Sequence, residues 1–203
     1  MREVIIVADD LGVCEERNRG ILRCIETGIV TRTSIMVNGP AAVDAVEIFH
    51  EKGLMGTVGL HLNLTEGKPI SDPELIPSLV IKQDQGAASI FRGKLGFREA
   101  CARGQVLARD VEREARAQVD WFRGHVGTAP RHVDGHQHCH VSAATRDVLT
   151  RVFVEANIEY VRTPSENQPV VNELCAVCST VGEEAQEVIH LTHSTMYSLV
   201  SPL

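Results

Sequence analysis

Short runs rich in β-branched residues alternate along the chain with segments of helical periodicity, and this alternation limits the fold more than any other feature. We expect strands over 3–8, 30–38, 55–64, 131–140 and 158–162. The helical spacing of apolar residues predicts helices over 15–27, 41–53 and 108–127, with one more before the last strand. Strands that alternate with helices build a parallel sheet. The predicted fold class is therefore α/β.

The composition favours one globular domain without a polyanionic partner. The chain has 203 residues, 43% of them hydrophobic, which is enough for a sizeable core. Its net charge of −7 gives no basic surface for nucleic acid or an anionic membrane. The apolar run near the N-terminus is too short for a signal peptide or a membrane span, and the six cysteines lack the spacing of a disulfide framework. We expect a cytoplasmic protein.

Residues 66–104 separate the third expected strand from the next long helix. The segment contains Gly and Pro and has weak periodicity. A connection of this length in a compact domain is usually functional. We expect a lid or an insertion at the active site.

Acidic and imidazole side chains gather near the ends of three expected strands. Asp9 and Asp10 follow the first strand, and His61 lies near the end of the third. Alternate residues of an extended strand share a face. On the strand at 131–140 the residues of one face are His132, Asp134, His136, His138 and His140. Because parallel α/β folds keep their chemistry at the C-terminal ends of strands, a carboxylate and two imidazoles there predict a site for a divalent ion with open positions.

Each of these features also has a purely structural explanation. An Asp-Asp-Gly sequence often caps the next helix, and a single residue such as His61 is often a hydrogen-bonded core histidine. Four histidines in ten residues can also form a surface tract that binds metal weakly. Their joint occurrence at three strand ends favours the functional interpretation.

Six segments carry a resemblance to a known family: VADDLG, IVTRTSIMVNGPA, GLHLNLTEGKP, FRGKLGFREA, PRHVDGHQHCH and VRTP. In this order and spacing they resemble the YdjC-like carbohydrate deacetylases, which include the chitooligosaccharide deacetylases, and especially the animal members. The resemblance covers about residues 3–165, so we treat 1–165 as a deacetylase domain and 166–203 as a divergent C-terminal tail. It implies a distorted TIM-like (β/α) barrel and a metal-dependent hydrolase that removes acetyl groups from an N-acetylated sugar or oligosaccharide.

The resemblance also implies roles for individual residues. Asp9 is implied to be the general base, and Arg162 to hold the sugar, with a structural salt bridge as its equal alternative. Asp134 and Gln137 are expected to orient imidazoles. The implied ligands of Mg²⁺, or of Zn²⁺ or another divalent ion, are Asp10, His61 and His136.

The motifs of the family stop near Pro164. The family's late His-Pro motif, implied to supply the histidine that protonates the leaving amine, does not occur, and neither His190 nor His193 precedes a proline. Five βα units do not close a barrel, so we expect an incomplete barrel, an open strand edge and self-association into a homo-oligomer. One alternative is a catalytically impaired metal-binding variant that acts through protein interactions. A metal phosphoesterase or other amidohydrolase is a third, disfavoured because no second carboxylate-bridged metal motif is present.

Overall fold

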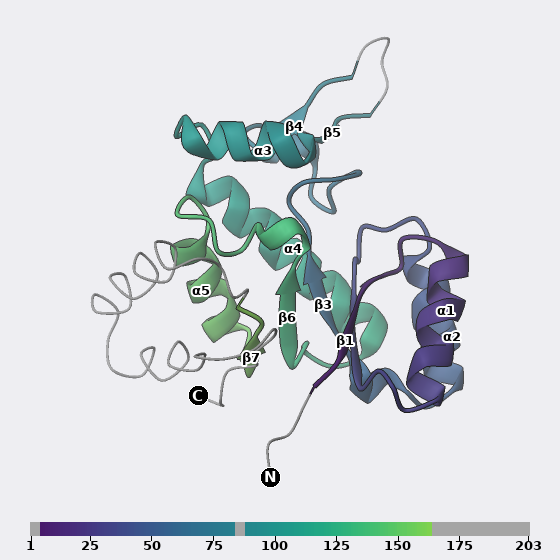
Figure 1. Cartoon of the computed structure of the whole chain (residues 1–203). Helices are drawn as coiled ribbons and strands as arrows, with labels where there is room; N and C mark the ends of the chain where they lie inside the picture. Colours follow the sequence, from purple (N-terminus) through teal and green to yellow (C-terminus); the bar gives the residue numbers. More distant parts are fainter. Residues whose placement is uncertain (1–4, 84–87, 164–203) are drawn as a thin grey trace.

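The main sheet is parallel, and its strands follow the order of the chain. The computed structural model of the protein describes residues 5–83 and 88–163 (Figure 1). The strands, in sheet order, are β1 (Val7–Leu11), β2 (Arg32–Ile35), β3 (Val58–Leu62), β6 (His132–Gly135) and β7 (Tyr160–Val161). Crossovers that always advance in one direction place all helices on one face, as in a (β/α) barrel and unlike a doubly wound sheet. The α/β prediction is confirmed. Within the described residues β1 and β7 are the edges of the sheet, and the expected incomplete, TIM-like barrel stays a prediction.

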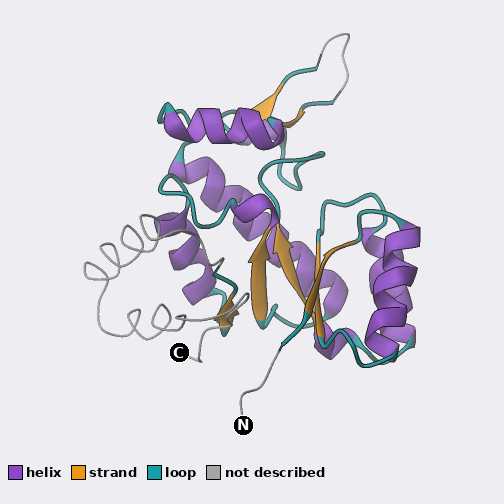
Figure 2. Ribbon diagram, in the orientation of Figure 1, coloured by secondary structure: helices purple, strands orange, loops and turns teal. Residues whose placement is uncertain are grey.

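Helices cover one face of this sheet, and polar side chains occupy the other. Their bounds are α1 (Glu15–Glu26), α2 (Ala42–Glu51), α4 (Ala108–Val126) and α5 (Arg146–Glu155), and a short 3₁₀ helix, η1 (Met55–Thr57), precedes β3. Figure 2 shows α1 and α2 beside the β1 edge and α4 against the middle of the sheet. Ile35, Leu60 and Val133 are fully buried in the hydrophobic core that contains the helical residues Phe49 and Phe122. No helix in the described part of the chain is long and apolar enough to cross a membrane.

The described residues of the segment after β3 form a layer beyond the C-terminal ends of β3 and β6 (Figure 1). It contains a 3₁₀ turn, η2 (Pro73–Leu75), the antiparallel pair β4 (Val80–Ile81) and β5 (Ile90–Phe91), and helix α3 (Gly93–Ala102). Buried carboxylates of α4 anchor it, because Glu114 accepts bonds from the amides of Ile70 and Ser71, at 3.0 and 2.9 Å. Asp110, one turn earlier, accepts the amide of Ser78 at 2.9 Å. The predicted insertion therefore lies at the end of the sheet that carries the expected site.

The predicted strand bounds were wrong at two places that affect the site. Strand β1 includes Asp9 and Asp10 instead of ending before them. Strand β6 ends at Gly135, and the next residues form a 3₁₀ turn, η4 (His136–His138), with positive φ at Gln137 (52°) and His138 (60°). A left-handed backbone cannot continue a strand. The expected common face of five side chains from 132 to 140 therefore does not exist.

Glycine at position 135 permits this turn. The ring of His140 folds back and occupies the space that a Cβ at residue 135 would need. A strand continued through 140 would carry this ring away instead. The tail 166–203, with His190 and His193, lies outside the described residues.

Candidate metal centre

A β-bulge lets two consecutive aspartates of β1 reach the same site. Ala8 is paired with Thr33 but Leu11 with Ile35, so three steps along β1 match two along β2. Neighbours in a regular strand point to opposite faces, whereas a bulge re-aims a side chain. Asp10 takes a left-handed φ of 63°, which aspartate tolerates better than most residues. The bulge therefore gives Asp9 and Asp10 different places around His61.

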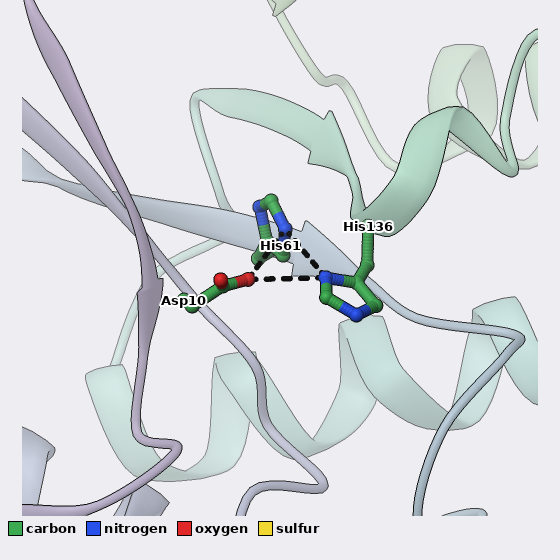
Figure 3. A group of neighbouring side chains, drawn as sticks. All are labelled: Asp10, His61 and His136. Carbon is green, nitrogen blue, oxygen red and sulfur yellow. Dashed lines mark hydrogen bonds and ion pairs between the residues drawn. The ribbon is translucent and has the colours of Figure 1, made fainter. Parts of the chain in front are cut away.

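Three side chains from β1, β3 and the turn after β6 converge on one point (Figure 3). Asp10 Oδ1 lies 3.1 Å from His61 Nε2 and 3.0 Å from His136 Nδ1, and the two nitrogens are 3.3 Å apart. Atoms that bind one ion at about 2.1 Å lie roughly 3.0–3.4 Å from each other in octahedral and tetrahedral sites. The three residues therefore fit one divalent ion, and they leave further coordination positions for water or substrate. This is the ligand set that the sequence predicts.

The charges of this cluster suit a cation. Hydrogen bonds from His136 and His61 hold the pKa of Asp10 well below its usual range. Burial by itself would lower the pKa of His136, but the hydrogen bond and charge of Asp10, with a smaller effect of Glu66, raise it above the ordinary value. The cluster thus stabilises a positive charge beside Asp10, which is also what a bound metal ion supplies.

Ser34 orients His61. Its buried hydroxyl lies 2.9 Å from His61 Nδ1. When Nδ1 donates its proton to this hydroxyl, Nε2 keeps its lone pair for an ion. Ser34 was not predicted from the sequence. The expected strand around it also carries Thr31, Arg32 and Thr33, so a hydroxyl residue there gives no distinct signal.

Arg162 forms ion pairs inside the protein. Its guanidinium donates two hydrogen bonds to Asp9, with Nη1–Oδ1 and Nη2–Oδ2 distances of 2.7 Å. Its Nε lies 3.2 Å from Oδ1 of Asp134, which is fully buried. The sequence predicts that Asp134 orients an imidazole, whereas the structure pairs it with Arg162. A contact between Arg162 and a sugar stays a prediction.

The other histidines of the 131–140 segment lie outside the cluster. Nε2 of His132 donates to the carbonyl of Thr33 at 3.2 Å, and Nε2 of His140 donates to the carbonyl of Arg162 at 2.8 Å. Burial lowers the pKa of His132 and lowers that of His140 to about 4. Both rings are therefore neutral near pH 7 and support the backbone. His138 is exposed.

A cleft of about 530 Å³ adjoins the metal centre, between α3 and the turn at 137–144. Its walls include Phe97, Arg98, Gln137 and Ser142. Gln137 also reaches the centre, with its Nε2 3.4 Å from Nε2 of His136. The volume is within the range of small-molecule sites. The insertion therefore builds one wall of a pocket that meets the candidate centre at Gln137, the residue next to His136.

Comparison with known proteins gives consistent matches. A family model described as YdjC-like protein matches residues 3–197, which extends past the last motif near residue 165. A carbohydrate deacetylase of Danio rerio is 40% identical over 164 residues, covering 81% of this chain and 50% of that protein. A chitooligosaccharide deacetylase of Serratia marcescens is 34% identical over 143 residues, covering 70% and 52%.

A solved structure is similar as well. A protein from Enterococcus faecalis V583, whose name refers to cellobiose-phosphate cleavage, aligns with a TM-score of 0.72 and 27% identity, over 91% of this chain and 64% of that one. The chain spans about half the length of the curated relatives it matches.

Proposed function

Because the chain belongs to the YdjC-like protein family, we propose that it acts as a metal-dependent hydrolase that removes acetyl groups from N-acetylated carbohydrates. The observation that carries this proposal is the convergence of Asp10, His61 and His136 within 3.3 Å of one another. A cleft of small-molecule size beside them supports it, as do relatives named carbohydrate and chitooligosaccharide deacetylase.

The donor atoms bear on the identity of the ion. The family resemblance implies Mg²⁺, but two imidazole nitrogens with one carboxylate oxygen suit Zn²⁺ and similar ions at least as well. When bound, such an ion polarises the acetamide carbonyl and lowers the pKa of a coordinated water. Both ions therefore belong in the test.

Asp9 is the proposed general base. Its side chain is partly exposed, next in sequence to a candidate ligand, and within the group of donor atoms around His61. Arg162 holds both carboxylate oxygens and so fixes their orientation. Each oxygen keeps a second lone pair with which to accept the proton of an attacking water.

The cleft is the proposed place of the sugar. Arg98 on α3 and Gln137 and Ser142 on the facing turn offer polar groups to hydroxyl and acetamide groups, and Phe97 offers an apolar surface. Pockets of this kind combine an apolar wall with a few placed polar groups.

The test is acetate release from an N-acetylated chitooligosaccharide, with added Mg²⁺ or Zn²⁺ and with phosphate release from a generic phosphoester as the comparison. We expect acetate release that requires the ion and is lost in Asp9→Asn. The matched control is Asp120→Asn, on an exposed position of α4. Phosphate release would favour the phosphoesterase, and metal binding without either product would favour the catalytically impaired variant. The cytoplasmic location and the self-association stay predictions.

A further inference from the structure

A network of amide side chains, buried at Asn63 and Gln118, fixes the backbone of Glu66 at the edge of the metal centre. Oδ1 of Asn63 accepts the amide of Glu66 at 3.1 Å, and Nδ2 of Asn63 donates to its carbonyl at 2.7 Å. Asn38 donates to the same carbonyl at 3.0 Å. The backbone N–H and C=O of Glu66 are therefore both held by side chains from the ends of neighbouring strands.

The network is anchored in helix α4. Gln118, which is fully buried, accepts the amide of Asn63 at 3.1 Å and donates to its carbonyl at 2.6 Å. It also donates to Glu114 at 2.8 Å. Connected and satisfied polar groups of this kind make a turn rigid. Glu66 thus projects from a firmly held turn.

The side chain of Glu66 reaches the outer edge of a candidate ligand. Its Oε2 lies 3.4 Å from Nε2 of His136, and its Oε1 accepts a hydrogen bond from the side-chain Nε2 of Gln137. The other ring nitrogen of His136, Nδ1, faces Asp10 and His61. The carboxylate therefore lies on the side of the ring opposite to the proposed ion.

We propose that Glu66 is a positioning residue that accepts the Nε2 proton of His136 and so presents Nδ1 as the ligand atom. This inference rests on the proposed function, because it assumes that the three residues bind an ion. Histidines that bind metals commonly donate their second N–H to a carboxylate, and loss of that partner lowers affinity. The Glu66 side chain is 48% exposed, so its effect comes from the orientation of the ring more than from charge.

The test compares Glu66→Ala and Glu66→Gln in the full chain, with Glu51→Ala, on an exposed position of α2, as the matched control. Calorimetric titration with Zn²⁺ should show affinity that falls by about 10- to 100-fold in Glu66→Ala. Glu66→Gln should recover much of it, because the amide oxygen still accepts the proton. The unfolding midpoints should stay equal, since the backbone of residue 66 is held by Asn63 and Asn38.

The second readout is the Nε2 proton of His136 in ¹⁵N-edited NMR spectra, recorded with and without Zn²⁺. We expect a signal protected from solvent exchange in the parent and in Glu66→Gln, and its loss in Glu66→Ala. A signal or an affinity that Glu66→Ala leaves unchanged would overturn the inference while the proposed function stands. If the parent bound neither Zn²⁺ nor Mg²⁺, the proposed function would fail, and the metal-free spectrum would still decide whether Glu66 pairs with His136.

Discussion

Replacement of Arg162 by methionine tests how much the guanidinium of Arg162 contributes to the free energy of unfolding. Methionine keeps an unbranched stem and removes the charge. Asp134 is fully buried and loses its ion-pair partner, and an unpaired buried charge costs about 3–5 kcal/mol. The two bonds to the partly exposed Asp9 add at most about 1 kcal/mol. We therefore expect the free energy of unfolding to fall by about 3–6 kcal/mol, out of the roughly 5–15 kcal/mol typical of a domain.

Urea unfolding followed by the fluorescence of Trp121 is the assay. Arg131→Met is the matched control, because Arg131 also makes two bonds to one carboxylate, Glu159, but at the surface, where such a pair contributes less than about 1 kcal/mol. The double variant Arg162→Met/Asp134→Leu should recover most of the loss, since it removes the buried charge as well. If Arg162→Met unfolded at the same urea concentration as Arg131→Met, the reasoning about Asp134 would be refuted.

Three further predictions concern the aspartates and histidines of the site. Asn tolerates the left-handed backbone of Asp10, so Asp10→Asn should lower the metal affinity measured by calorimetry with little effect on the backbone. Asp9→Asn should keep the ion and lower acetate release by about 10²- to 10⁴-fold. Equal loss of the ion from both variants would contradict the assigned roles. The pKa of His136 is raised, and the ion must displace its proton. Metal affinity should therefore fall by about tenfold per pH unit below that pKa. A metal affinity that does not change between about pH 8 and 5 would exclude His136 as a ligand. Burial lowers the pKa of His140 to about 4, so the unfolded chain takes up this proton at a higher pH than the folded chain does. The free energy of unfolding should therefore fall by up to about 3 kcal/mol as the pH drops from about 6.5 to 4. Urea midpoints at pH 7 and 4.5 should show a smaller drop in His140→Gln, and an equal drop would assign the acid sensitivity elsewhere.

Local patterns in the sequence carry much of the fold and the ligand set. The 108–127 helix follows from apolar residues at helical spacing and from Gly127, which takes a left-handed φ of 85° at its end. The rule that parallel strands end at one edge of the sheet predicts that an aspartate, His61 and a histidine of the 131–140 segment lie together, and the family resemblance implies the choice of Asp10 and His136. These are properties of single segments and of their order.

Other features depend on neighbours distant in sequence. The bulge in β1 exists only relative to β2, so period-two reasoning could not separate Asp9 from Asp10 geometrically. The turn at Gln137 lacks the Gly or Asn that usually marks a left-handed residue, and it therefore appeared as a continued strand. The ion pair of Arg162 with Asp9 joins residues 153 positions apart, which no local pattern predicts.

The central claim is that one divalent ion is held by Asp10, His61 and His136, and calorimetric titration with Zn²⁺ tests it most directly. The parent chain should bind one ion. His136→Ala should lose at least about tenfold in affinity, since it removes a ligand and even the loss of a ligand's partner has that effect. His138→Ala is the matched control, two residues away and exposed, and should bind as the parent does. The account would be contradicted if the parent bound no ion. It would also be contradicted if His138→Ala lost affinity while His136→Ala bound as the parent does.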